Sequence, residues 1–248
     1  MKNLFITIIV SIFTLGSTET ILSQTEKDLD KMLFYYVDGE YERLLDKAIA
    51  FTEDEDTRRN PVPYIYVSKA YFEMSKIEEY DEDYPRAYRD AVKYAAKFTK
   101  KDKEGEFKAE NEEYIDGLKI QTFELADNYY QIANYSKAKR YFKYLVGMDP
   151  EDWGAWFLKG VNEVQINMKS DSEISLKNAM DGLSSLEKDE VELYFPGKIM
   201  LLKKGILYYA EYLRDNGKTG EAKEVIELGY TFFEDDNEYK INYDDYTR

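Results

Sequence analysis

The spacing of apolar side chains is the feature that most constrains the fold of this 248-residue chain. Apolar residues recur at intervals of three and four, as in Leu125, Tyr129 and Ile132, which places them on one face of a helix. Beyond the N-terminal segment, no stretch alternates for long between apolar and polar residues, the pattern typical of a half-buried strand. The spacing therefore predicts an all-α protein.

Five prolines and short polar breaks interrupt the pattern. Proline lacks an amide hydrogen, so it is tolerated in the first turn of a helix or just beyond its end. The intervals between the breaks predict about ten helices, which would form five antiparallel pairs. We place these helices at 25–37, 40–53, 63–77, 84–100, 107–131, 135–147, 152–168, 172–187, 196–215 and 219–234.

The composition excludes several kinds of chemistry. The formal charge is −16, and a protein that binds the phosphate backbone of a nucleic acid needs a cationic face, so no nucleic-acid partner is expected. The chain has no His and no Cys. It therefore lacks Ser-His and Cys-His nucleophile pairs, thiolate and imidazole metal ligands, and disulfides. We expect no metal and no cofactor.

The N-terminus has the organisation of a secretory signal peptide. Lys2 precedes an apolar run over 4–15, and small polar residues follow it. The run is too short for a membrane span, which needs roughly 20 apolar residues. We expect residues 1–23 to be cleaved, leaving a chain without a membrane span outside the cytoplasm, in the periplasm or the medium. Frequent Lys, Asn, Ile and Tyr suggest a bacterial source.

One helix pair carries a more specific pattern than periodicity. It consists of small and aromatic residues at fixed offsets, namely Leu125, Ala126, Tyr129, Tyr135, Ala138, Phe142 and Pro150. This pattern resembles the tetratricopeptide repeat (TPR), a helix hairpin of 34 residues, although Thr122 occupies the Trp position. Weaker matches begin near Tyr64, Trp156 and Leu201. The resemblance implies a right-handed α-solenoid of about five hairpins over 24–234. Residues 235–248 form an acidic, Tyr-containing polar tail, either capping the last repeat or disordered.

A TPR-like stack has a concave face lined by the first helix of each pair. In the TPR register this face would present Ile65, Lys69, Phe72, Phe123, Asp127, Tyr130, Phe157, Val161, Leu202, Ile206 and Tyr209. Partly exposed aromatic side chains are effective anchors for a partner, because they bury a large area at a small entropic cost. We therefore expect this groove to bind a peptide segment of another protein. A basic segment is one option, because acidic residues are concentrated in the loops.

The sequence leaves two alternatives for which positions of the last two helix pairs face the core. In the TPR register, Lys159 and Glu163 occupy positions that should be apolar. A shift of one residue gives a better apolar stripe. The last five groove residues, from Phe157 to Tyr209, would then belong to the core.

Two classes of function follow. The first is a non-catalytic scaffold for protein–protein contact, which fold-level analogy supports. The alternative is a carboxylate-dependent, glycan-active enzyme, whose two carboxyl groups would converge in a cleft about 5–10 Å apart. A structural subunit of a cell-envelope assembly is a further option, and self-association through a poorly capped end is possible.

Overall fold

The structure is a computed structural model that describes residues 27–248. Within this range all regular structure is helical, which confirms the all-α prediction. The chain divides into two compact units, the first ending at Tyr94 and the second beginning at Ala95. The predicted signal peptide, 1–23, lies outside the described residues. Among the described helices, none is long and apolar enough to cross a membrane.

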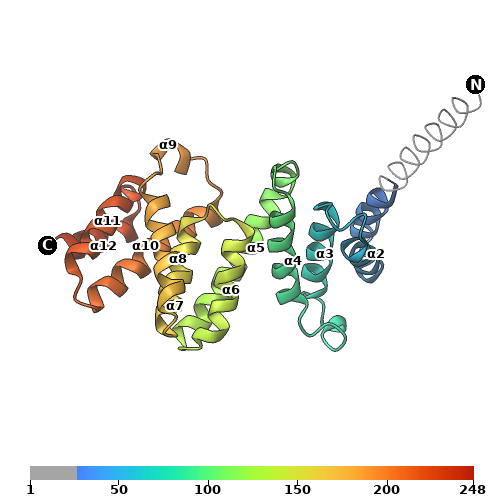
Figure 1. Cartoon of the computed structure of the whole chain (residues 1–248), viewed down its shortest axis with the longest axis horizontal. Coiled ribbons are helices and arrows are strands. Elements are labelled where there is room, and N and C mark those ends of the chain that lie inside the picture. The colour runs from blue at the N-terminus through green and yellow to red at the C-terminus, as the bar shows by residue number, and fades with distance from the viewer. Residues whose placement is uncertain (1–26) are drawn as a thin grey trace, which may run out of the picture. The chain divides into compact units, whose positions relative to one another are not determined.

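The first unit contains a helix at 27–37, α2 (Tyr41–Glu53), α3 (Val62–Met74), a 3-10 turn η1 (Glu78–Tyr80) and the beginning of α4 (Ala87–Lys101). Figure 1 labels α2, α3 and α4. Its core is a compact apolar cluster that includes Met32, Leu44, Val67 and Met74. Tyrosine rings surround this cluster, and the hydroxyl of buried Ser68 donates a hydrogen bond to the carbonyl oxygen of Ala91 at 2.8 Å.

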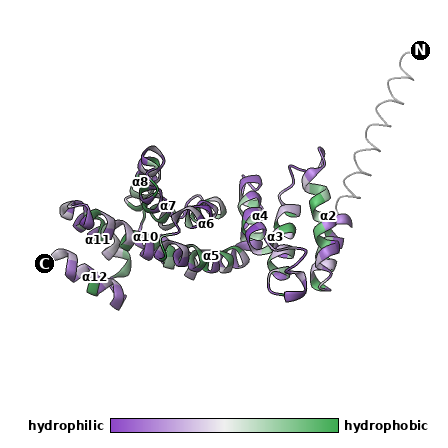
Figure 2. Ribbon diagram, turned by 90° about the horizontal axis from the view of Figure 1, so that it is seen from below, coloured by the Kyte–Doolittle hydropathy of each residue, from purple (hydrophilic) through white to green (hydrophobic). Residues whose placement is uncertain are grey.

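The second unit begins in the last turns of α4 and continues through eight helices. These are α5 (Lys108–Gln131), α6 (Tyr135–Met148), α7 (Trp153–Gln165), α8 (Lys169–Leu183), α9 (Lys188–Val191), α10 (Pro196–Asp215), α11 (Thr219–Phe233) and α12 (Asn237–Thr247). Helices that follow one another pack together, notably α5 with α6, α7 with α8, and α10 with α11. This packing is consistent with a helical repeat-like fold. Figure 2 shows hydrophobic and hydrophilic residues along the same helices, as expected of amphipathic helices.

The predicted helices match the structure to within a few residues. The main differences lie where a turn residue ends a helix earlier than expected. After α7 the backbone turns at Asn167, which has a positive φ of 59°, so α7 ends at Gln165 and α8 begins at Lys169. The short helix α9 and the terminal helix α12 were not among the predicted spans.

The C-terminal segment 235–248 contains α12, which packs against α11. Its anchor is Tyr239, whose side chain is fully buried and donates a hydrogen bond to the carbonyl oxygen of Ile226 at 3.0 Å. The segment is therefore helical over Asn237–Thr247 and covers part of α11. The second unit therefore runs past residue 234 to the end of the chain.

A close helix crossing organises the second unit. A Cβ atom at Gly154 in α7 would lie 2.2 Å from the carbonyl carbon of Leu201 in α10, and one at Gly205 would lie 2.4 Å from the carbonyl oxygen of Gly154. Atoms this close overlap, so neither position has room for a side chain. Glycine at both positions allows α10 to lie directly on α7.

The two charged residues in the apolar register of α7 are accommodated by pairing. Glu163 is buried, and its carboxylate lies 2.8 Å from the Lys159 ammonium and accepts a hydrogen bond from the Ser175 hydroxyl at 2.7 Å. Burial of a carboxylate is tolerated when it is paired and hydrogen-bonded. These contacts join α7 to α8 and allow Glu163 to occupy a position that the sequence pattern reserves for an apolar residue.

Candidate functional site

The structure buries much of the predicted groove. Six of its eleven side chains are at most 6% exposed, namely Ile65, Phe123, Phe157, Val161, Leu202 and Ile206. Tyr209 is half-buried and packs against the same core as Phe157, with ring centroids 5.1 Å apart. The five residues from Phe157 to Tyr209 therefore belong to the core of the second unit, as the shifted register predicts, and Leu201 and Glu163, which the unshifted register places inside, are buried as well. These side chains fill the interior, so they do not line an open face.

The groove residues of the first unit sit among aromatic neighbours. Ile65 is buried, and the Lys69 ammonium lies 5.8 Å from the ring centroids of both Tyr36 and Tyr66. Phe72 is half-buried, with the Lys76 ammonium 3.9 Å from its ring centroid. Lysine over aromatic rings is a stabilising arrangement within the unit.

In the second unit, Asp127 and Tyr130 are held by a residue that was not predicted, Tyr208 of α10. The Tyr208 hydroxyl donates to the Asp127 carboxylate and accepts from the Gln131 side chain at 2.8 Å. The rings of Tyr130 and Tyr208 are 5.5 Å apart. Burial and the bond to Asp127 raise the pKa of Tyr208, so its proton stays in place. This cluster joins α5 to α10.

An open cavity lies elsewhere in the second unit. A cavity of about 530 Å³ is lined by residues from four segments, 98–105, 108–119, 148–151 and 190–198. The segments are the end of α4 with the loop after it, the first half of α5, the α6–α7 loop, and the stretch from α9 to the first turn of α10. Cavities of this size bind small molecules or single side chains of a partner.

An ionic cluster forms one wall of the cavity. The ammonium of Lys119, a nearly buried side chain on α5, lies 2.6 Å from the Asp152 carboxylate and 3.2 Å from that of Asp149. Asp149 also pairs with Lys198 at 3.2 Å. Burial acts to raise the pKa of Asp149, but the charges of Lys119 and Lys198 outweigh it, and the net pKa is lowered. Burial raises the pKa of Asp152. Burial acts to lower the pKa of Lys119, but the charges of Asp152 and Asp149 outweigh it, and the net pKa is raised.

A second carboxylate on α5 fixes the start of α10. Asp116 accepts hydrogen bonds from the backbone amides of Gly197 at 2.9 Å and Lys198 at 3.1 Å. These are among the first amides of α10, which have no partner within their own helix. A Cβ atom at Gly197 would lie 2.6 Å from an oxygen of Asp116, so a side chain there would displace this carboxylate. The contact positions Lys198 at the cavity.

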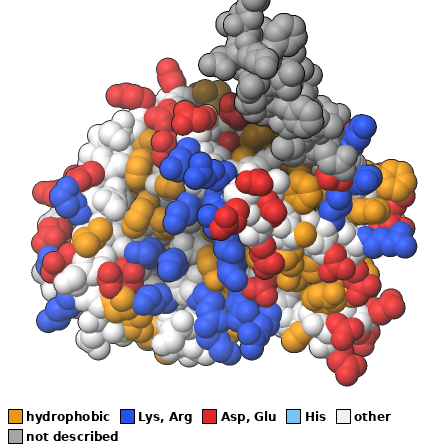
Figure 3. Space-filling view, turned by 45° about the vertical axis from the view of Figure 1, so that its right-hand side comes forward, with side chains coloured by type: hydrophobic (Ala, Val, Ile, Leu, Met, Phe, Trp, Pro, Cys, Tyr) orange, Lys and Arg blue, Asp and Glu red, His pale blue; other side chains and the backbone are white. Residues whose placement is uncertain are grey.

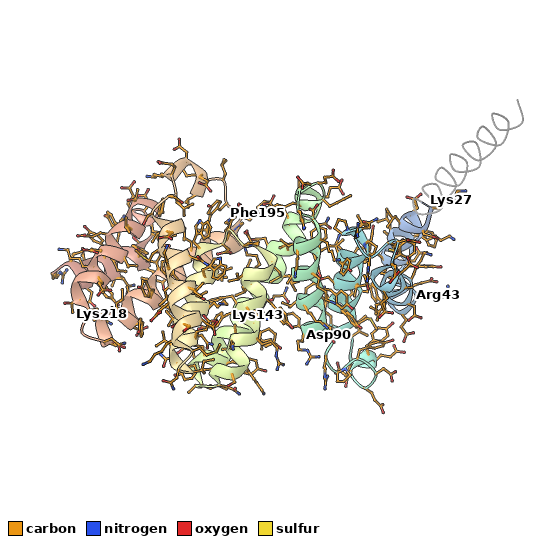
Figure 4. All side chains as sticks on the ribbon, viewed as in Figure 1. Lys27, Arg43, Asp90, Lys143, Phe195 and Lys218 are labelled. Carbon is orange, nitrogen blue, oxygen red and sulfur yellow. The ribbon has the colours of Figure 1, made fainter. Side chains whose placement is uncertain are left out.

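The edge of the cavity carries exposed apolar side chains. Leu193 is 84% exposed and Phe195, labelled in Figure 4, is 38% exposed. Between them, the Tyr194 hydroxyl donates to Glu190 at 2.8 Å, and the Lys198 ammonium lies 4.3 Å from the Tyr194 ring centroid. The edge therefore combines uncovered apolar surface with charges that already have partners.

Two of the carboxylates near the cavity are engaged by other groups of the protein. Several carboxylates converge on the cavity, as the enzyme alternative requires. Yet Asp149 is held between two lysines, and Asp152 is buried behind the lining, where it accepts from the Ala155 amide at 3.0 Å as the N-cap of α7. Among residues 27–248, no group of three or more His, Cys, Asp or Glu side chains is placed to hold a metal ion.

Sequence reasoning missed this site, although one signal for it exists. Asp116 and Lys119 fall on the buried stripe of α5, together with Leu118 and Phe123. Charged residues at buried helix positions must find partners, because an unpaired buried charge is costly. Their partners come from distant parts of the chain, and this pairing is not visible in a local pattern.

No protein-family model matches this chain, and a search of curated proteins found no similar sequence.

Proposed function

We propose that the protein is an exported, non-catalytic scaffold with TPR-like helix hairpins, and that it binds a peptide segment of another protein at the cavity of the second unit. The observation that carries this proposal is the exposure of Leu193 and Phe195 beside an open cavity of about 530 Å³. The cavity replaces the eleven-residue groove as the binding site, because most of that groove is buried.

A peptide fits this site better than a metabolite does. An anchoring side chain would enter the cavity, while the rest of the segment would cover the apolar edge outside it. Burying exposed apolar surface contributes about 25 cal/mol per Å², so the edge adds affinity that a ligand confined to the cavity cannot gain. The ionic cluster would stay intact and give the cavity a fixed shape.

The wider architecture supports a scaffold. Successive helices pack in a repeat-like way, and the TPR-like pattern at 125–150 falls on α5, α6 and the turn after them. We propose right-handed stacking of these hairpins. The apolar N-terminal run over 4–15 supports export to the periplasm or the medium.

Site-specific photocrosslinking in the source cells tests the proposal. A photoreactive amino acid replaces Leu193, and the matched control carries it at Ile174, an exposed apolar residue of α8. We expect discrete protein adducts from position 193 that are absent from position 174. Mass spectrometry of the adduct identifies the partner and the crosslinked segment.

Two results would contradict the proposal. One is the same adduct pattern from both positions, which indicates random collision. The other is an absence of protein adducts from 193 together with a small molecule that copurifies with the chain and protects the cavity from hydrogen exchange.

A further inference from the structure

The second unit contains a helix with uncompensated positive charge. From Tyr135 to Met148, α6 contains four basic residues and no acidic one, although acidic residues outnumber basic ones 50 to 34 in the whole chain. Figure 3 shows Lys and Arg side chains in blue and Asp and Glu side chains in red on the visible face of the molecule. We define the α6 basic face as Lys137, Arg140, Lys143 and Tyr144, which the helical spacing places on one side of α6.

The cations of this face have no acidic partner. Lys137, Arg140 and Lys143 are exposed, and none of them takes part in an ion pair among residues 27–248. Figure 4 labels Lys143 midway along the helix. The fourth base, Lys139, contacts the sulfur of Met168 instead.

Most basic residues later in the same unit are neutralised. Lys203 lies 2.8 Å from Asp236, Lys204 lies 2.7 Å from Glu238, and Arg214 lies 2.9 Å from Asp245. In the described part of the chain, carboxylates therefore pair with these bases of the C-terminal helices, and none forms an ion pair with a base of α6. On α6, three such unpaired cations lie on one helix that has no acidic residue of its own.

Tyrosines border the face. The Tyr141 ring stacks on Tyr129 of α5 with centroids 6.0 Å apart, and the Lys137 ammonium lies 5.1 Å from the Tyr129 ring centroid. Tyr144 is half-buried on the same side of the helix as the cations. The face therefore offers apolar contact as well as charge.

The short length of the α6 basic face favours a short anionic ligand. Lys137 and Lys143 are six residues apart, or about 9 Å along a helix. The Debye length at 0.1 M salt is about 10 Å, so a short anionic segment on this face responds mainly to the three cations. A membrane or a nucleic acid extends much further and would also meet the acidic remainder of the protein.

We propose that the α6 basic face binds an acidic peptide segment of a partner protein. Two or three carboxylates within about five residues would meet Lys137, Arg140 and Lys143, and the Arg140 guanidinium can hold a carboxylate with two parallel hydrogen bonds. An aromatic side chain in the segment would pack on Tyr144. This surface is distinct from the cavity, and the proposal stands whether or not the cavity binds a partner.

Fluorescence polarisation with the purified full chain and a labelled Glu-Asp-Phe-Glu-Asp peptide tests the proposal. The test variant is Lys137→Glu/Arg140→Glu/Lys143→Glu. The control variant is Lys177→Glu/Lys218→Glu/Lys223→Glu, which changes the net charge by the same amount at three other exposed lysines. We expect at least tenfold weaker binding in the test variant and less than a threefold change in the control.

Several outcomes overturn the proposal: no binding to the unchanged protein, equal loss in both variants, or no loss in the test variant. Stronger α6-dependent binding to anionic lipid vesicles or to duplex DNA than to the peptide also overturns it. So does salt-sensitive self-association abolished by the test variant, since a second copy of the chain would then be the occupant. If the charge-reversal variant does not fold, the corresponding triple glutamine variant is compared with its own control under the same criteria.

Discussion

The two units of this protein are stabilised in different ways. The core of the first is a cluster of Met, Leu, Val and Ala side chains within a wall of tyrosines, with Ser68 as its buried polar residue. The interior of the second includes charged residues, among them Asp116, Lys119, Asp152 and Glu163, and a glycine crossing of two helices. A helical protein can therefore combine a conventional apolar core with an interior that depends on paired charges. The open cavity described above lies in the second.

The largest expected effect concerns the glycine crossing. Gly154→Val places branched carbons inside the backbone of α10, and we expect the second unit to lose about 5 kcal/mol or fail to fold. Urea unfolding followed by circular dichroism measures the loss. The matched change Gly117→Ala, in open space on α5, should instead stabilise the protein by about 0.5–1 kcal/mol. Equal effects at the two glycines would show that the crossing is looser than described.

The next effect concerns the ionic cluster. Lys119→Met leaves the buried Asp152 without its cation and leaves Asp149 with Lys198 alone, and we expect a loss of about 4 kcal/mol in the free energy of unfolding. Adding Asp152→Asn removes the stranded charge and should restore part of that loss. A double variant no more stable than Lys119→Met would indicate that Lys119 acts through packing alone.

The apolar core of the first unit should respond as ordinary cores do. Leu44 is fully buried, and Leu44→Ala should cost about 3 kcal/mol through lost burial and an unfilled cavity. Amide hydrogen exchange read by mass spectrometry should show the loss of protection in residues 27–94. The control Leu228→Ala removes a side chain that is 38% exposed, so it should cost under about 1 kcal/mol. Equal losses of unfolding free energy in the two variants would show that burial does not determine the contribution of these two leucines to stability.

The smallest effect is a pH dependence of the first unit. Burial, together with the charges of Asp90, Tyr94 and Tyr84, raises the pKa of Tyr71 to about 12. The folded state therefore favours the neutral phenol. Its contribution to stability is complete below pH 10 and is lost as the pH rises through 12. Tyr71→Phe should flatten this part of the stability profile, measured by urea unfolding at successive pH values. An unchanged alkaline slope would exclude Tyr71 as a source of it.

The contrast between an apolar core and an interior of paired charges also explains how much of the structure could be predicted from the sequence. Spacings of three and four predict the helices of both units, because amphipathic periodicity is a local property. They also indicate Phe157 and Val161 as core residues once the register is shifted. The cavity could not be predicted, because its contacts join residues that are distant in the sequence. Lys119 of α5 pairs with Asp149 and Asp152 of the α6–α7 loop, and Asp116 of α5 binds the first turn of α10. These contacts depend on tertiary structure.

The capping of α10 by Asp116 has a consequence for the order in which the second unit forms. A chain emerging from the ribosome exposes α5 well before Gly197 and Lys198 have been synthesised, so the carboxylate that accepts from them is present first. The first turn of α10 gains this acceptor only when it docks onto α5. A chain truncated before α10 would leave the Asp116 carboxylate without these two amide donors.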